Sequence, residues 1–257
     1  MKIITSKDNA LIKQRTLLKT TKGRKAEGMF LVEGLRLCLD AVNSSFTFVD
    51  AFFTEQFLKS HNEDAEKIMQ CSKNCVMVSP EIMQKLCDTE NPQGVICVCK
   101  KPNLSFELKS DGKYILLENV SDPSNLGAIS RTAEAFGLDG LLLTGGCDLF
   151  NSKALRASMG ALFRLPTAEY ASIEDAVATL KEKNIITYAA VVKDAEKEIR
   201  EVNFQKGCAA IIGNEANGLS NTAKDLANVL VTIGMDGRAE SLNAHAASAV
   251  FIWEMVR

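Results

Sequence analysis

Short apolar runs alternate with amphipathic stretches along this chain, which is the pattern of an α/β layer protein. In the first hundred residues the runs predicted to be strands are 29–32, 46–53, 76–78 and 94–99. The stretches predicted to be helices are 7–19, one opening at Glu33-Gly34, 64–71 and 80–86, and 20–28 is predicted to be a loop. Pro102 and the polar stretch 103–113 then interrupt the pattern.

The alternation resumes after this interruption with more apolar strands. The predicted strands are 114–117, 138–143, 185–191, 209–212 and 229–233, and the predicted helices are 125–136, 152–159, 173–183 and 241–255. Strands that alternate with helices predict a mostly parallel sheet with ligands at the carboxyl ends of the strands. We therefore divide the chain into a first domain, 1–102, a linker, 103–113, and a second domain, 114–257.

Length and composition are those of an ordinary globular protein. The 257 residues are 46% hydrophobic and 24% charged, which is enough for two domains that need no disulfide or metal. There is no uninterrupted apolar run of about 18 residues and no apolar segment after the N-terminal lysines, so we expect neither a membrane span nor a secretory signal. We expect a cytoplasmic protein.

The eight cysteines lie mostly at apolar positions, as expected of buried, reduced thiols. Zinc is the alternative, because Cys71, Cys75, Cys97 and Cys99 could supply four thiolates. No paired CxxC motif exists, so we predict no metal. His61 and His245 are the only histidines and neither adjoins a catalytic-looking cluster, which argues against histidine-based catalysis.

Positive charge is concentrated near the start of the chain, although the net charge is −2. Residues 1–36 hold nine Lys or Arg against three acidic residues. Such a stretch can neutralise RNA phosphates, or it can be a solvated helix face with a polar loop. The candidate RNA-binding residues are Lys13, Lys19, Lys22, Arg24 and Lys25.

Candidate chemistry lies in three loops of the second half, each directly after an apolar strand. They are 118–131, 211–220 and 233–244, and they carry glycine, amide and small residues. The chain lacks the GxGxxG, GxxxxGK[ST], HExxH and GxSxG motifs of other enzyme classes. Taken singly, each loop could be an ordinary strand-to-helix turn with a good cap.

Taken together and in this order, the three loops resemble the three motifs of the SpoU (TrmH) family of RNA methyltransferases, in the SPOUT superfamily. The segment 156–166 resembles the family's stretch between the first and second motifs. In the first half, Ile4-Thr5-Ser6, Asn9, Lys13, 30–34 and 92–95 resemble the ribosomal-protein-like, L30e-like substrate-binding domain of many members. The resemblance implies an L30e-like α/β domain followed by an α/β SPOUT domain with a deep trefoil knot, although knots are otherwise very rare.

The resemblance also implies the cofactor and the site residues. S-adenosylmethionine would be held by Thr144, Gly145, Gly213, Asn214, Glu215, Ile233, Met235, Ser241, Leu242 and Asn243. The functional polar positions would be Arg131, Asn125, Glu215, Ser241 and Asn243. A family proposal makes this arginine help to deprotonate the ribose hydroxyl, but a guanidinium has a pKa above about 12 and is a poor base. We expect instead that Arg131 binds an RNA phosphate and the developing alkoxide.

The expected function is methyl transfer from S-adenosylmethionine to a ribose 2'-hydroxyl of RNA, with 23S ribosomal RNA, free or in an assembling particle, as the expected substrate. Two alternatives remain open: a tRNA ribose methyltransferase, and a non-catalytic RNA-binding protein with the same fold. A dinucleotide-dependent α/β enzyme fits poorly because the glycine fingerprint is missing. Members of the family are typically homodimers through the knotted domain, with the last helix at the interface.

Overall fold

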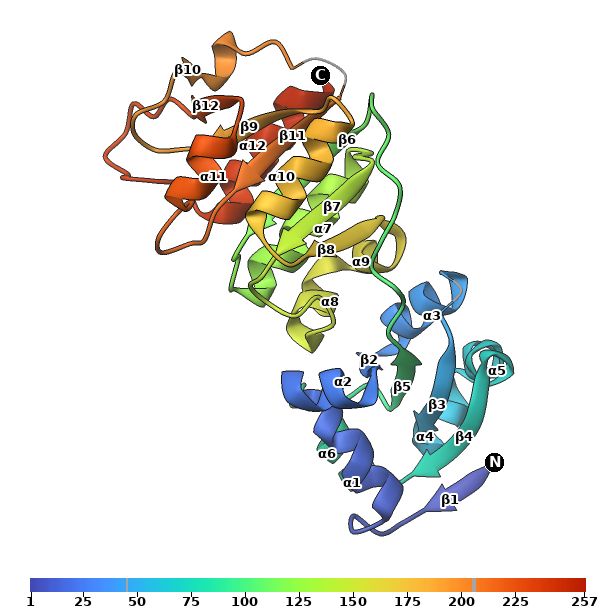
Figure 1. Ribbon diagram of the computed structural model, residues 1–257. Helices are drawn as coiled ribbons and strands as arrows, with labels where there is room; N and C mark the ends of the chain where they lie inside the picture. Colours follow the sequence, from blue (N-terminus) through green and yellow to red (C-terminus); the bar gives the residue numbers. More distant parts are fainter. Residues whose placement is uncertain (45, 205–206) are drawn as a thin grey trace. The chain divides into compact units, whose positions relative to one another are not determined.

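The computed structural model describes residues 1–44, 46–204 and 207–257. The chain folds into two compact units, which are drawn in Figure 1. Unit 1 consists of residues 1–103 and 150–163, and unit 2 consists of residues 104–149 and 164–257.

Unit 1 is built on a five-stranded sheet of order β1-β4-β3-β5-β2. The strands are β1 (Lys2–Ile4), β2 (Met29–Glu33), β3 (Phe48–Phe53), β4 (Ser72–Val78) and β5 (Val95–Lys100). The helices are α1 (Ala10–Thr16), η1 (Leu17–Lys19), α2 (Thr21–Glu27), α3 (Leu35–Asn43), α4 (Glu55–Ser60), α5 (Asn62–Cys71), α6 (Pro80–Leu86), α8 (Ser152–Ser158) and α9 (Ala161–Arg164). β1, β4 and β3 are parallel, whereas β5 runs antiparallel to both β3 and β2.

Strands β2, β3 and β5 of this sheet are buried on both faces, which explains why they read as nearly continuous apolar runs. Ile12 of α1 and Ile82 of α6 share one core with Phe52 and Val98 of the sheet. α3 and α5 pack against each other and against other positions of the same strands. A buried ion pair, Arg15 Nε to Asp50 Oδ2 at 2.6 Å, ties α1 to β3.

Unit 2 is built on a seven-stranded, entirely parallel sheet of order β10-β12-β9-β11-β6-β7-β8. The strands are β6 (Lys113–Glu118), β7 (Gly140–Thr144), β8 (Thr167–Tyr170), β9 (Ile186–Ala190), β10 (Lys197–Glu198), β11 (Cys208–Ile212) and β12 (Val229–Thr232). The helices are α7 (Pro123–Ala135), α10 (Ile173–Glu182), η2 (Ile199–Glu201), α11 (Asn221–Leu226) and α12 (Ala244–Val256). The predicted parallel α/β sheet is thus confirmed.

Helices cover both faces of this sheet, with α10 and α11 on one face and α7 and α12 on the other (Figure 1). The core under α10 and α11 includes Tyr114, Leu142, Val177 and Ile211. α12 packs against α7 and β11 on the opposite face. Because every strand is parallel, all the loops that follow the strands open at the same edge.

The predicted loop 20–28 is wrong, because residues Thr21–Glu27 form helix α2. The segment has no apolar periodicity, so the pattern of hydrophobic positions gave no helix signal. The helix is instead specified at its ends: Thr20 accepts a hydrogen bond from the Gly23 amide at 3.0 Å, and Gly28 closes it in the left-handed region at φ 61°. α4 and α11 were likewise missed, and each is only six residues long.

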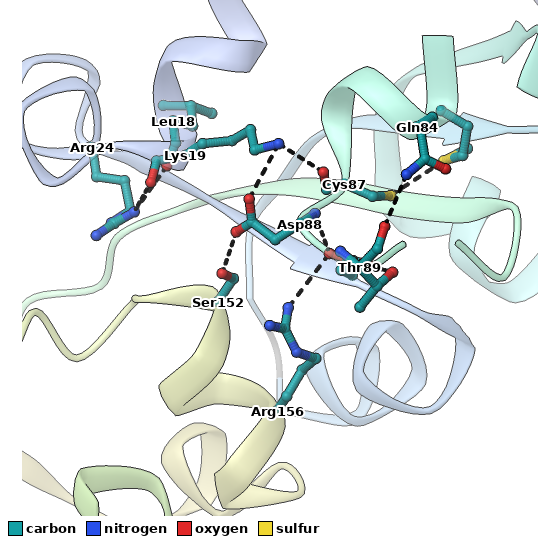
Figure 2. A network of polar contacts seen from close by, with 11 residues as sticks. Leu18, Lys19, Arg24, Gln84, Cys87, Asp88, Thr89, Ser152 and Arg156 are labelled. Atoms are coloured by element: carbon teal, nitrogen blue, oxygen red, sulfur yellow. Dashed lines mark hydrogen bonds and ion pairs between the residues drawn. The ribbon is translucent and has the colours of Figure 1, made fainter. Parts of the chain in front are cut away.

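The segment 150–163, which the sequence-based boundaries place in the second domain, packs with unit 1. Phe150 lies 4.3 Å, centroid to centroid, from Phe30 of β2. Arg156 Nη1 lies 3.5 Å from Glu33 Oε2, and Ser152 hydrogen-bonds Asp88 (Figure 2). A segment distant in sequence from unit 1 is therefore held to it by both aromatic and polar contacts.

The predicted linker 103–113 forms neither helix nor strand before β6, but most of it is packed on unit 2. Leu108 is buried in the core of that unit, and Phe106 covers Gly140, where an added Cβ would lie 2.2 Å from the ring. Glycine at position 140 is thus needed for the ring to lie on the sheet.

The eight cysteines are free thiols in the structure, and five of them, Cys38, Cys87, Cys97, Cys99 and Cys208, are buried. Burial raises the pKa of the Cys208 thiol to about 11, so this thiol stays protonated and unreactive near neutrality. Among the described residues, no helix has the length and apolar character required to cross a membrane.

Candidate active site

Two of the three predicted functional loops of unit 2 meet where β6 and β11 end, side by side in the middle of the sheet. β6 runs into the loop 119–122 and β11 into the loop 213–220. Glu118, the last residue of β6, is buried and accepts hydrogen bonds from the Ser220 amide at 2.9 Å and hydroxyl at 2.6 Å. Ser220 also caps α11, so the two loops are fixed to each other at their base.

The side chain of Glu215 binds the loop 119–122. Its carboxylate accepts hydrogen bonds from the amides of Ser121 and Asp122, each at 3.1 Å, and from the Ser121 hydroxyl at 3.0 Å. Asn125, in the first turn of α7, donates to the same carboxylate from Nδ2 at 2.9 Å. We call these four residues, Ser121, Asp122, Asn125 and Glu215, the glutamate clasp.

The clasp keeps Glu215 ionised. Partial burial acts to raise the pKa of this carboxyl, but the hydrogen bonds from Asn125 and from the Ser121 and Asp122 amides outweigh it and lower the pKa to about 2. A carboxylate with so low a pKa is a poor general base near neutrality. The structure therefore gives Glu215 the task of holding Asn125 and the loop in place.

The turn that carries Glu215 is compact. Asn214 Oδ1 accepts from the amides of Ala216 and Asn217, and its Nδ2 donates to the Asn119 carbonyl at 2.8 Å. Gly213 has no room for a side chain, since an added Cβ would lie 2.3 Å from the Gly218 carbonyl carbon. Close approach of the Gly218 backbone thus requires glycine at position 213, and the side-chain hydrogen bonds of Asn214 hold the turn.

A cavity of about 490 Å³ opens beside this turn, at the carboxyl ends of β9, β11 and β12. Seven of the predicted cofactor-binding residues line it: Gly213, Asn214, Glu215, Ile233, Met235, Ser241 and Leu242. The wall combines apolar side chains with the backbone of loops, a composition typical of small-molecule sites.

Three of the predicted cofactor residues lie outside the lining. Thr144 and Gly145 end β7 and support the neighbouring loop: the Asn119 amide donates to the Thr144 carbonyl at 2.9 Å, and an added Cβ on Gly145 would lie 2.3 Å from Asn119 Oδ1. Asn243 caps α12 by accepting from the Ala246 amide at 2.6 Å. These three residues do not line the cavity but contact the loop and the helix that border it.

Arg131 is exposed on α7 and forms no hydrogen bond or ion pair with any residue that the structure describes. Asn125 lies at the start of the same helix, in the glutamate clasp. A guanidinium that no neighbouring carboxylate neutralises is available to an anionic ligand.

The sequence reasoning missed the part of the cavity that follows β9. Residues Ala190, Val191, Val192, Lys193 and Asp194 line it. β9 lies between β12 and β11 in the sheet, so its carboxyl end must open into the same space as theirs. Sheet order was the missing signal, because 190–194 matches no motif by itself.

The predicted RNA-binding residues of unit 1 divide into two groups. Lys13, Lys22 and Lys25 are exposed, although Lys13 pairs with Asp8 at 2.9 Å. Arg24 is 2% exposed and donates to the carbonyls of Leu18 and Lys19, each at 3.0 Å (Figure 2). Lys19 is half-buried, donating to the Cys87 carbonyl at 2.7 Å and pairing with Asp88 at 3.2 Å. The last two cations are thus engaged inside the unit.

Comparisons with known proteins agree with this geometry. Residues 112–253 match the model of the SpoU rRNA Methylase family, and residues 9–97 match that of the MRM3-like substrate binding domain. The chain is 29% identical to the 23S rRNA (guanosine(2553)-2'-O)-methyltransferase RlmP of Bacillus subtilis over 99% of both chains. It is 26% identical to the 23S rRNA (uridine(2479)-2'-O)-methyltransferase of Streptomyces viridochromogenes over 99% of this chain and 91% of that protein. It also resembles the crystal structure of the AdoMet-bound rRNA methyltransferase from Sinorhizobium meliloti, with a TM-score of 0.88, 28% identity, and 99% and 97% of the two chains covered.

Proposed function

The chain belongs to the SpoU rRNA methylase family, and we propose on this premise that it methylates a ribose 2'-hydroxyl of 23S ribosomal RNA with S-adenosylmethionine as the methyl donor. The observation that carries the proposal is the cavity at the ends of β9, β11 and β12, which adjoins the glutamate clasp through Asn214 and Glu215. In this proposal the cavity holds the cofactor and the neighbouring glutamate clasp faces the RNA.

The residues of the cavity fit the cofactor. Ile233, Met235 and Leu242 offer apolar surface for an adenine ring, and Gly213 lets a ligand approach the backbone because it has no side chain. When bound, S-adenosylmethionine supplies a methyl group activated by its sulfonium. Ser241, on the wall of the cavity, and Asn243, at the cap of α12, position the loop that closes it.

Arg131, Asn125 and Ser241 act on the RNA in this proposal. Arg131 binds the phosphate next to the target ribose and stabilises the negative charge that develops on the 2'-oxygen as its proton leaves to water. Asn125, fixed by Glu215, orients the ribose together with Ser241. The guanidinium stays protonated throughout, because its pKa is far above neutrality.

The first unit holds the RNA. Lys13, Lys22 and Lys25 are its exposed candidates for phosphate contacts, and recognition of folded RNA depends largely on shape and phosphates. Ribosomal RNA, free or in an assembling particle, is the proposed substrate, because two relatives that match over nearly the whole chain are named as 23S rRNA methyltransferases. We place the protein in the cytoplasm, where that substrate is made.

We also propose a knotted homodimer. α12 returns from the edge of the sheet, after β12, to pack on α7, β11 and β6 near its centre, which is compatible with the trefoil knot of the family. Trp253 of α12 is 52% exposed and meets the 41% exposed Phe136 edge to face. Exposed aromatic residues on one helix pair are typical of a surface that a second copy covers.

The test is transfer of labelled methyl from S-adenosylmethionine to ribosomal RNA that lacks the modification, supplied free and as immature particles, with the labelled ribose mapped afterwards. Incorporation at one 2'-hydroxyl is expected, and Arg131→Ala should reduce kcat by roughly a hundredfold or more. Arg131→Lys tests bidentate positioning, and nearly full activity with unchanged RNA affinity would contradict it. A folded wild-type protein that binds RNA without transferring methyl groups would support the non-catalytic alternative.

A further inference from the structure

A groove on unit 1 stands apart from the basic residues of α1 and α2. It has a volume of about 620 Å³ and is lined by Leu35, Arg36, Leu39, Asp40, Phe57, His61 and Gln93. These residues come from α3, from α4 and its C-terminal cap, and from the turn before β5. α3, α4 and α5 lie together on one side of the unit in Figure 1.

An aromatic platform forms one wall of the groove. The rings of Phe57 and His61 are stacked, with centroids 4.8 Å apart and planes 12° from parallel. Phe57 is buried whereas His61 is exposed, so the imidazole extends the apolar wall to the surface. Ser60 Oγ lies 2.8 Å from His61 Nδ1, which fixes the orientation of the ring. A flat ring held in this way can stack on a nucleobase.

Polar groups around the platform suit the rest of a nucleotide. Arg36 is exposed and has neither a hydrogen bond nor an ion pair to a described residue, so its guanidinium is available to a phosphate. Gln93 accepts from the Leu35 amide through Oε1 at 2.9 Å, and within the described parts of the chain nothing accepts from its Nε2 group. Nε2 can donate to an acceptor on the edge of a base.

We propose that this groove binds one unpaired nucleotide of the RNA substrate, with the base stacked on His61, the phosphate on Arg36 and the base edge toward Gln93. The inference rests on the proposed function in taking RNA as the substrate. It adds a site that reads an unstacked base, a form of recognition that phosphate contacts alone cannot give.

The test is direct crosslinking of the full-length protein to 23S ribosomal RNA with short-wavelength ultraviolet light, followed by digestion and mass spectrometry. Cleavage after Lys59 and Lys67 yields the peptide 60–67, which contains His61. A nucleotide adduct on this peptide or on Arg36 is expected. Adducts confined to other parts of the chain would overturn the proposal.

Measurements of Kd for the same RNA compare variants of the groove with a control variant outside it. His61→Ala should raise Kd roughly tenfold, whereas His61→Phe, which keeps a ring, should stay within about twofold of wild type. Arg36→Ala should raise Kd about threefold and reduce the salt dependence by about one phosphate contact. Lys67→Ala, which removes one positive charge on α5 outside the groove, should change Kd by less than about twofold.

Thermal unfolding of each variant shows whether a change in Kd comes from loss of structure. Equal Kd values for wild type, His61→Ala and Arg36→Ala would overturn the proposal and leave the groove to a ligand other than RNA. Methyl transfer by the wild-type protein decides the proposed function separately, because a protein without transferase activity can still crosslink through the peptide 60–67.

Discussion

Each of the two units contains a glutamate that gathers the hydrogen-bond donors of a distant loop. In unit 1, Glu33 at the end of β2 accepts from the amides of Asp88 and Thr89, at 2.9 and 3.3 Å, and from the Thr89 hydroxyl. In unit 2, Glu215 after β11 accepts from the Ser121 and Asp122 amides and from two side chains. Both carboxylates bring together segments that are far apart in sequence.

The surroundings of the two glutamates differ. Glu33 is 8% exposed and also pairs with Arg156 of α8, so it lies inside the folded unit. Glu215 is exposed and lies at the carboxyl ends of parallel strands, on the wall of the cavity. The same arrangement of donors therefore lies inside the fold in one place and, in the other, holds Asn125, to which the proposed function gives a role in orienting the ribose. Four predictions test this difference.

The largest effect is expected from Glu33→Ala. It removes a buried carboxylate and leaves two part-buried amides, one hydroxyl and one cation without their acceptor, so the free energy of unfolding should fall by about 3 kcal/mol. Urea denaturation measures the change. Glu81→Ala serves as the control, because Glu81 is an exposed partner of Lys7 whose loss should leave stability unchanged. Equal midpoints for the two variants would show that Glu33 has no structural role.

Glu215→Gln should lower kcat and leave stability nearly unchanged. The amide cannot accept from all four donors, so Asn125 and the loop 121–122 shift, and kcat should fall about a hundredfold. The midpoint of urea denaturation and the Kd for RNA should change little, since the residue is exposed. Loss of stability as large as that of Glu33→Ala would remove the contrast between the two glutamates.

Arg24 and Lys25 are adjacent in α2, and they also differ in burial: Arg24 is buried whereas Lys25 is exposed. Arg24→Ala deprives two carbonyls of a buried donor and should lower the free energy of unfolding by about 2 kcal/mol. Lys25→Ala should leave stability unchanged and reduce the slope of log Kd for RNA against log salt by about one. If Arg24→Ala altered the salt slope without altering stability, its guanidinium would be an RNA ligand after all.

The smallest effect concerns pH. The pKa of Glu215 is lowered from 4.5 to about 2 in the folded protein, so its contribution to stability is fully present above pH 4.5 and is lost as the pH falls toward 2. The difference in unfolding free energy between wild type and Glu215→Gln should be constant from pH 7 to about 5 and vanish near pH 2. Solvent screening keeps this difference small. If the difference in unfolding free energy did not change with pH, the negative charge of Glu215 would not contribute to the clasp.

Much of unit 2 could be predicted from its sequence because its central strands are buried on both faces and stand out as apolar runs, such as 114–117 and 209–212, whereas the less buried outer strands β8 and β10 were missed. α2 and the short helices α4 and α11 were missed, because their boundaries depend on caps and on a few buried contacts instead of a periodic apolar stripe. Seven residues that line the cavity lie on motif-bearing loops and could be predicted, whereas the wall 190–194 could not, since it depends on β9 lying beside β11 and β12.

The sequence by itself determined the α/β class, the parallel sheet of unit 2 and the loops that carry the chemistry, because hydrophobic period and strand-end residues are local properties of the chain. Tertiary structure alone decided which charges are free to act. Arg24 and Glu33 are engaged in buried contacts, and Glu215 is held by donors about ninety residues away in the chain. Arg131 is left exposed. Burial and pairing are set by segments that meet only when the chain folds, so residue type could not distinguish these roles.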